Sequence, residues 1–157
     1  MKIIEKKILF AEEKQVLREL WNNEYPARLY LKTIEDFDLY LNGLSNTKHY
    51  LLMDDSNKII GWTVTFLRNE ENWFAIILNS KIQGKGNGSL LIEKLKENND
   101  CLNGWVIDQE NELKQNKEFY KSPMPFYIKH GFAICSEIRI ENEKMSGLKI
   151  NWSHEIN

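Results

Sequence analysis

Apolar residues recur at regular intervals, and their period changes along the chain. Residues 3 to 10 are rich in Ile, Leu and Phe and predict a strand. Leu17, Leu20 and Trp21 follow at helical spacing, and a polar and aromatic loop over residues 22 to 30 comes next. The chain is therefore expected to open with a strand followed by a helix.

A second helix is predicted near residues 34 to 44. Thr33 followed by Asp36 resembles a capping box, in which two side chains satisfy the first free N–H groups of a helix. The apolar residues after it share one helical stripe: Ile34, Phe37, Leu41 and Leu44. Two helices are thus expected before the main sheet.

The middle of the chain predicts strands. Residues 49 to 53 and 58 to 67 are joined by the turn-forming residues 54 to 57, which predicts an antiparallel hairpin. Residues 73 to 78 are continuously apolar, as in a strand covered on both faces. They lead into a glycine-rich run, and the stripe after it predicts a helix: Leu91, Ile92 and Leu95.

The last third alternates between polar and apolar segments. Residues 104 to 107 suit another buried strand, and the polar residues 108 to 121 predict a long surface loop. A short helix is indicated by residues that favour helix ends: Ser122, Pro123 and Gly131. Two more strands are expected near residues 132 to 140 and 147 to 153. The elements predict a mixed α+β domain with a mostly antiparallel central sheet flanked by helices.

Composition narrows the class of protein. A chain of 157 residues, 42% hydrophobic and 28% charged, fits one domain over residues 1 to 157. The net charge of -2 leaves no basic stripe for a nucleic-acid partner. The sequence has no apolar run long enough to predict a membrane segment or a signal peptide, so a cytoplasmic location is expected. Cys101 and Cys135 are isolated, which predicts small buried residues and neither a metal site nor a disulfide.

The glycine-rich run, Gln83 to Ser89, lies between a predicted buried strand and a helix N-terminus. Free N–H groups and the helix dipole favour an anion at such a place, and glycine lets backbone approach phosphate. The run does not fit the nucleotide P-loop, because Gly86 follows Lys85 where that motif has Ser or Thr. It also fails the dinucleotide fingerprint, because its third glycine comes one residue early.

The same run resembles the QxxGxG pattern of the GNAT (Gcn5-related N-acetyltransferase) family, with Gln83, Gly86 and Gly88 in the defined places. The resemblance implies a GNAT-like acyl-CoA acyltransferase fold in which loop and helix hold the pyrophosphate of acetyl-CoA. The implied cofactor-binding residues are Ile76, Leu78, Gln83, Gly84, Lys85, Gly86, Asn87, Gly88 and Ser89. A proline that the family often carries after the preceding strand is replaced by Ser80.

A second segment, residues 125 to 132, is similar to the family's FYxKxGF motif. With both motifs the resemblance covers about residues 58 to 138. Where many members have Asn seven residues before the motif's tyrosine and Ala four before it, this chain has Tyr120 and Pro123. The resemblance assigns Tyr127 a functional place beside the cofactor.

Acetyl transfer to an amine needs a proton for the departing thiolate, stabilisation of an oxyanion, and a neutral amine. The resemblance makes Tyr127 the candidate acid and a backbone N–H near Leu78 the group that polarises the thioester carbonyl. Asp108 and Glu24 are candidate bases, although water can also relay the proton. His130, near a helix C-terminus, is interpreted as a partner of the helix dipole.

Several alternatives remain open. The acceptor is expected to be a small-molecule or peptide amine, and the acidic residues near the expected mouth favour a cationic one: Glu24, Glu35, Asp36 and Asp38. Aromatic residues that can line its pocket or belong to the core are Trp21, Tyr25, Trp62 and Trp105. The protein can be a monomer or a homodimer. A non-catalytic acyl-CoA sensor and a nucleotide-binding enzyme are the rival functions.

Overall fold

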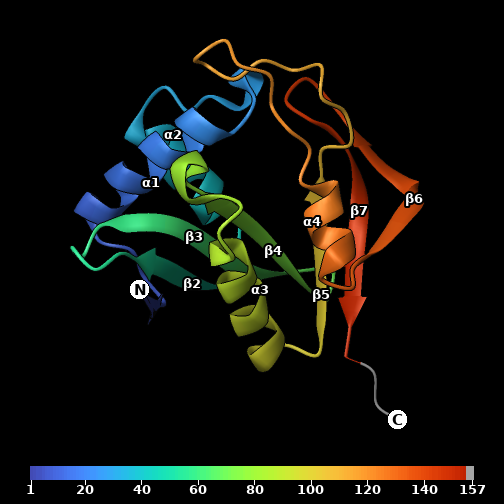
Figure 1. Cartoon of the computed structure of the whole chain (residues 1–157), viewed down its shortest axis with the longest axis horizontal. Helices are drawn as coiled ribbons and strands as arrows, with labels where there is room; N and C mark the ends of the chain where they lie inside the picture. The colour runs from blue at the N-terminus through green and yellow to red at the C-terminus, as the bar shows by residue number, and fades with distance from the viewer. Residues whose placement is uncertain (155–157) are drawn as a thin grey trace.

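The computed structural model describes residues 1 to 154, and a seven-stranded sheet forms its centre (Figure 1). The strands lie in the order β1-β2-β3-β4-β5-β7-β6, and β4 and β5 are the one parallel pair in that order. The bounds are β1 Lys2–Lys6, β2 Ser45–Met53, β3 Ile59–Arg68, β4 Glu71–Leu78, β5 Cys101–Val106, β6 Ala133–Glu141 and β7 Ser146–Ser153. The predicted mixed, mostly antiparallel sheet is confirmed.

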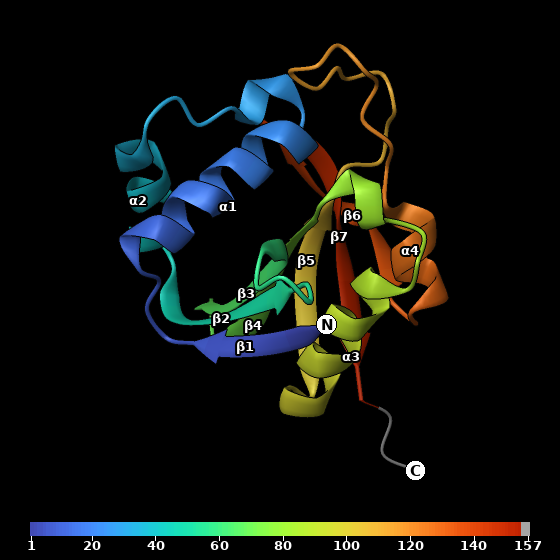
Figure 2. The same cartoon turned by 60° about the vertical axis from the view of Figure 1, so that its left-hand side comes forward.

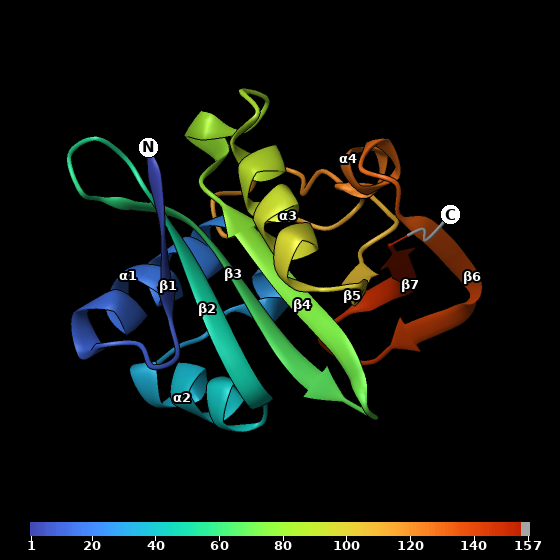
Figure 3. The same ribbon diagram turned by 90° about the horizontal axis from the view of Figure 1, so that it is seen from below.

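Helices cover both faces of the sheet, with α1 and α2 on one face and α3 on the other (Figures 2 and 3). Their bounds, with two short 3-10 turns, are α1 Ala11–Glu24, η1 Ala27–Leu29, α2 Ile34–Asn42, η2 Ser80–Ile82, α3 Asn87–Asn98 and α4 Met124–Lys129. The predicted capping box is confirmed, since the Asp36 N–H donates to Thr33 Oγ1 at 3.2 Å and the Thr33 N–H to Asp36 Oδ2 at 3.1 Å. Among the described helices, none is long and apolar enough to cross a membrane.

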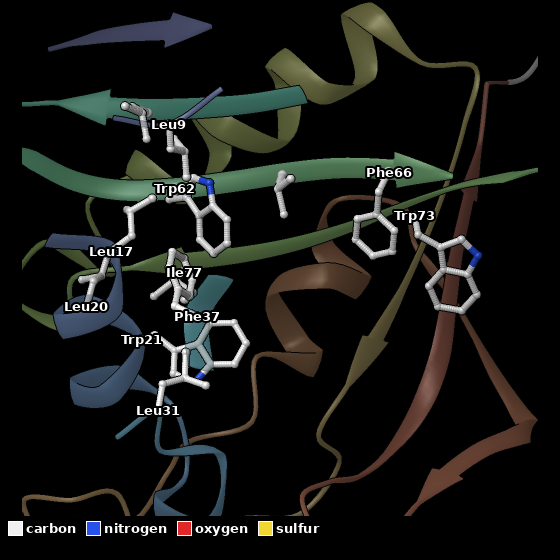
Figure 4. Close-up of a cluster of buried hydrophobic side chains, with 12 residues drawn as sticks. Leu9, Leu17, Leu20, Trp21, Leu31, Phe37, Trp62, Phe66, Trp73 and Ile77 are labelled. Carbon is white, nitrogen blue, oxygen red and sulfur yellow. The ribbon is translucent and has the colours of Figure 1, made fainter. Parts of the chain in front are cut away.

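Two apolar cores lie on opposite faces of the sheet. The first packs α1 and α2 against β2, β3 and β4, and Figure 4 shows members of it: Leu17, Leu20, Trp21, Phe37, Trp62 and Ile77. The second packs α3 and α4 against the other face and contains Tyr50, Leu52, Phe74, Leu91, Ile92 and Tyr127. Because Ile77 faces one core and Phe74 the other, β4 is covered on both faces, as its continuous apolar run predicts.

The N-terminal strand and β5 differ from their predicted bounds. The strand expected over residues 3 to 10 ends at Lys6. Glu13 accepts the Phe10 N–H at 2.7 Å and so starts α1 at that point. Strand β5 begins at Cys101 instead of residue 104, because Cys101 and the next residues already pair with β7.

The short helix α4 starts later than expected. The Ser122 hydroxyl donates to the Ile107 carbonyl at 2.6 Å and accepts the Met124 N–H at 3.3 Å. Pro123 is therefore the residue that precedes the helix and not its first member. The other end is confirmed, since Gly131 has a φ of 83° in the left-handed region where glycine ends a helix.

The expectation that both cysteines are buried is wrong. Cys101 and Cys135 are free and half-buried. The Cys101 sulfur lies 3.5 Å from Nδ2 of Asn151, among polar side chains of β5 and β7. Polar neighbours, rather than an apolar core, therefore surround this thiol.

His49 makes the first core sensitive to acid. Its side chain is 3% exposed, and Nδ1 accepts the Trp62 Nε1–H at 3.0 Å. Burial lowers the pKa of His49 from 6.5 to about 4, and Lys14 lowers it further while Glu13 opposes the shift. The unfolded chain therefore binds a proton between these pH values that the folded chain does not bind.

We expect the free energy of unfolding to fall as the pH drops from 6.5 to 4, by about 3 kcal/mol from His49 alone. Urea unfolding at both ends of that range measures it. In His49→Gln, whose amide can still accept from Trp62, this part of the loss should disappear. The exposed His154 provides the control, His154→Gln. An unchanged pH dependence in His49→Gln would contradict the assignment.

Candidate active site

Strands β4 and β5 separate toward their C-terminal ends. Trp73 and Asn103 are the one register pair that joins them within the described residues. The Asn79 N–H bonds to β3, and backbone groups alternate along a strand, so those of Ile76 and Leu78 point toward β5. A gap therefore opens between the two strands beyond Trp73, with the backbone of Ile76 and Leu78 along its wall.

Side chains replace the missing strand partner at the two carbonyls that face the gap. The Tyr25 hydroxyl donates to the Ile76 carbonyl at 3.3 Å, and Gln83 Nε2 donates to the Leu78 carbonyl at 2.9 Å. A buried carbonyl without a donor would cost about 1–3 kcal/mol. The acceptors of the gap are thus occupied from within the chain, and the N–H groups of Ile76 and Leu78 are directed into it.

The glycine-rich loop joins β4 to α3 at one end of this gap. Gly84 and Gly86 have φ values of 79° and 82°, which L side chains rarely adopt, so both positions need glycine. The Asn87 side chain donates to the Ile82 carbonyl at 3.0 Å and fixes the loop against η2. A Cβ atom built at Gly84 or Gly86 would meet nothing within 4 Å, so open space lies beside the loop.

Several backbone N–H groups of this loop and of the start of α3 lack partners. The first N–H bonded back into α3 is that of Leu90, which donates to the Gly86 carbonyl at 3.3 Å. The N–H groups of residues 84 to 89 have no acceptor within the described chain. Free N–H groups at a helix N-terminus, with room in front of them, favour a phosphate or another anion.

Gly88 has a different structural role from the other two glycines. Its added Cβ would lie 3.1 Å from Cζ of Phe126, so this glycine lets α3 and α4 pack closely. A side chain at Gly88 would therefore disturb the packing of α4 as well as the loop. The sequence pattern predicts only the contact with a cofactor.

Tyr127 lies on α4 at the second core and is 5% exposed. Its ring packs against Phe74 of β4 and against Phe132, with centroid distances of 6.0 and 5.5 Å. Burial raises the pKa of Tyr127 far above its ordinary value, and the neighbouring Tyr120 raises it further. Its phenol is therefore protonated throughout the neutral range.

Two more phenols lie near Tyr127. Burial raises the pKa of Tyr25 well above its usual value, and the proximity of Tyr40, Tyr120 and Tyr127 adds to the effect. Tyr25 belongs to the first core and Tyr127 to the second, so the two cores approach each other at the gap. From the sequence, Tyr25 is only a pocket candidate and Tyr120 only a departure from the family pattern.

Both carboxylates predicted as bases have cationic partners. Glu24 accepts the Ser80 N–H at 2.9 Å, and its other oxygen lies 3.7 Å from Lys114 Nζ. Asp108 forms a two-point pair with Arg139, in which the shorter distance is 2.5 Å. Glu24 is thus next to the end of β4, whereas Asp108 follows β5 and lies on the opposite side of the gap.

The loop between β5 and α4 docks onto the end of α1, and Figure 1 shows it arching over that end of the molecule. Pro26 and Lys114 form a β-bridge, and Arg28 forms a two-point pair with Glu112 at 2.6 and 3.1 Å. Beside these contacts is an open groove of about 630 Å³, lined by charged and polar residues that include Arg28, Asp108, Glu112, Arg139 and Glu141.

The other aromatic candidates separate into core and rim. Trp21 and Trp62 are buried in the first core, so their predicted place in a pocket is not favoured. Trp105 is half-buried, and its ring centroid lies 5.1 Å from that of Trp73, the β4 residue that still pairs with β5 before the gap opens. Tyr25 is the member of the set whose polar atom reaches the wall of the gap.

No protein-family model matches the sequence, and no curated protein matches it. Solved structures match over nearly the whole chain. An aminoglycoside 6′-N-acetyltransferase complexed with coenzyme A has a TM-score of 0.71 at 15% identity, over 98% of this chain and 97% of that chain. A phosphinothricin acetyltransferase of the GNAT superfamily from Sinorhizobium meliloti, in complex with AcCoA, has a TM-score of 0.66 at 11% identity, over 98% and 89%. This chain has the GNAT fold.

A spermidine/spermine N-acetyltransferase from Vibrio cholerae shares the GNAT fold as well, with a TM-score of 0.62 at 15% identity, over 96% of this chain and 92% of that chain. The fold expected from the two sequence motifs is confirmed. The motif predicts Gln83 only as a cofactor-binding residue, and Tyr25 is only a pocket candidate; their donation to the carbonyls on the gap is a contact that no local pattern encodes.

Proposed function

We propose that the protein is an acetyl-CoA-dependent N-acetyltransferase that passes the acetyl group directly to an amine. The observation that carries the proposal is the position of the unpaired N–H groups of residues 84 to 89 at one end of a gap beside β4, the strand whose Phe74 packs against the Tyr127 ring. The GNAT fold supports it, because solved neighbours with coenzyme A or AcCoA share this architecture.

The residues present fit the cofactor. The loop supplies free N–H groups and open space for a diphosphate, and the glycines at 84 and 86 keep side chains away from it. Within the gap, the N–H groups of Ile76 and Leu78 can bind amide or thioester carbonyls. When bound, acetyl-CoA supplies the activated acyl group. The carbonyls of Ile76 and Leu78 already have donors, so this wall of the gap offers mainly donors.

Tyr127 is the proposed proton donor to the departing thiolate. Its buried phenol stays protonated, and its hydroxyl has no hydrogen-bond partner within the described residues. A donor that is both protonated and unpaired can reorient toward a sulfur atom in the gap. The N–H of Leu78 is the proposed donor to the developing oxyanion.

Glu24 is the better placed of the two proposed bases. Its carboxylate is one hydrogen bond from Ser80, directly beyond the end of β4, and its side chain is 10% exposed. To take a proton it must loosen its contact with Lys114. Asp108 is held by Arg139 on two points and is proposed to shape the acceptor groove instead.

The acceptor is proposed to be a small-molecule or peptide amine that enters from the groove beside Arg28. Three of the acidic residues expected to attract a cation have partners: Glu24 with Lys114, Asp36 with the Thr33 N–H, and Asp38 with Lys14. Two of these carboxylates, Glu24 and Asp38, are therefore paired with a cation inside the chain. The names of the neighbours, an aminoglycoside and a spermidine/spermine N-acetyltransferase, are consistent with an amine acceptor.

An acyl-CoA sensor without turnover is the alternative, favoured by Tyr120 beside Tyr127, where the family pattern has a smaller residue. Release of free CoA thiol across a panel of amines separates the two functions. Binding of acetyl-CoA without any thiol release would support the sensor.

The role of the glycine-rich loop can be tested by acetyl-CoA binding. Acetyl-CoA at one hundred times its Kd should stabilise the fold by about 2.7 kcal/mol, seen as a rise in Tm. Gly86→Asp should weaken acetyl-CoA binding at least tenfold more than Gly86→Asn, because the two side chains have the same shape and differ by one charge. The two variants should have similar Tm values without ligand. Equal Kd values for the pair would mean that no diphosphate binds there.

The role of Tyr127 as proton donor can be tested by removing its hydroxyl. Tyr127→Phe removes only the hydroxyl and should lower kcat by about 10²-fold to 10⁴-fold, the usual contribution of a positioned general acid. The Kd of acetyl-CoA should change by no more than a few-fold. The loss should shrink with a more acidic leaving thiol, which needs less help from a proton donor. Tyr40→Phe is the matched control and should retain its kcat, because Tyr40 is half-buried against the first core. An unchanged kcat in Tyr127→Phe, with chemistry rate-limiting, would make Tyr127 structural.

A further inference from the structure

Ser89 and His130 are hydrogen-bonded across the contact between α3 and α4. Ser89 Oγ lies 2.8 Å from His130 Nε2, and His130 Nδ1 lies 3.8 Å from the Glu93 carboxylate. Ser89 is the third residue of α3 and contributes one of the N–H groups without an acceptor in the described chain. This pair therefore links the loop to the last turn of α4.

The position of Glu93 determines which nitrogen of His130 carries the proton in the neutral ring. A carboxylate beside Nδ1 favours a proton on that nitrogen, so Nε2 is left with its lone pair toward Ser89. The Ser89 hydroxyl must then donate to His130. In this state its hydrogen is unavailable to an anion in front of the loop.

Protonation of His130 reverses that hydrogen bond. Nε2 then donates to Ser89 Oγ, and the hydroxyl hydrogen is free to donate to a phosphate oxygen. The ring also gains a positive charge close to the loop. Anion binding and protonation of His130 therefore favour each other.

The surroundings of His130 keep it neutral in the absence of an anion. Burial lowers its pKa below 6.5, Lys96 and Lys129 lower it further, and Glu93 opposes them. Lys96 also donates to the His130 carbonyl, and the Phe126 ring lies 4.7 Å away. A ring that is neutral alone and gains an anionic neighbour on binding takes up a proton.

We propose that His130 is a positioning residue for the diphosphate of acetyl-CoA, acting through Ser89, and that the diphosphate binds together with a proton that His130 takes up. The inference rests on the cofactor role proposed above. It assigns His130 more than the interaction with the helix dipole that the sequence indicates. It also predicts that affinity for the cofactor falls as the pH rises.

The test is calorimetric titration of the intact protein with 3′-dephospho-CoA, in buffers of different ionisation enthalpy. This probe keeps the diphosphate but lacks the 3′-phosphate monoester, which itself titrates at a pH of about 6. The dependence of the binding enthalpy on the buffer then gives the protons taken up by the protein. We expect uptake of a clear fraction of one proton near pH 6.5, and a Kd about five-fold to tenfold weaker at pH 8 than at pH 6.

Two variants and one control test the roles of the two side chains. His130→Gln should bind with no proton uptake and with a Kd that is nearly independent of pH. Ser89→Ala leaves the imidazole in place and should lose most of the uptake, so it tests the link if His130→Gln folds poorly. His154→Gln, at an exposed histidine, should behave like the parent protein. S-acetylpantetheine, which lacks the diphosphate, should cause no uptake.

The outcomes separate this inference from the proposed function. If the parent protein binds 3′-dephospho-CoA with the same enthalpy in every buffer, the role of His130 is wrong while the cofactor role stands. If Ser89→Ala takes up as many protons on binding 3′-dephospho-CoA as the parent protein, His130 does not act through Ser89. If neither acetyl-CoA nor 3′-dephospho-CoA binds the parent protein at any pH, the proposed function itself fails.

Discussion

The separation of β4 from β5 is the constraint on which the rest of the site depends. Two parallel strands inside a sheet normally satisfy each other's backbone groups, and buried groups left without partners are costly. Here Tyr25 and Gln83 bond to the carbonyls of Ile76 and Leu78, so the lost hydrogen bonds on this wall of the gap are those of the N–H groups. Because both substitutes are donors, the wall that remains presents N–H groups.

The two apolar cores also approach each other at the gap. The strands separate the α1 and α2 side of the sheet from the α3 and α4 side, and at the gap residues of both sides lie near each other. Tyr25 comes from one side and Tyr127 from the other, with Tyr120 near both. A protonated phenol can be buried there because no strand backbone occupies the space. The same geometry that lacks a strand pair thus provides a place for a proton donor.

Local patterns predicted the parts of the fold that local interactions determine. The Thr33 and Asp36 pair gave the start of α2, and the apolar run before Gln83 gave β4 and the loop. Contacts between distant segments were not predictable in this way. Tyr25 and Ile76 are 51 positions apart in the sequence, and Ser89 and His130 are 41 apart. Contacts over such separations produce no periodic pattern of residues that could predict them. The polarity of residues 108 to 121 predicted a loop but not its docking on α1.

The charged residues around the acceptor side lead to a more general point about specificity. Arg28 with Glu112, Asp108 with Arg139 and Glu24 with Lys114 are paired inside the chain, so each charge is available to a substrate only if its partner is displaced. The pairs of Arg28 and Arg139 are partly exposed, and exposed ion pairs are worth about 0–1 kcal/mol, which a substrate amine or carboxylate can offset. Glu24 and Lys114 are only 10% and 11% exposed, so opening that pair leaves a largely buried charge and costs more. On the proposed function, acceptor choice then depends on which pairs a substrate can open, and the sign of the net charge at the mouth says little about it.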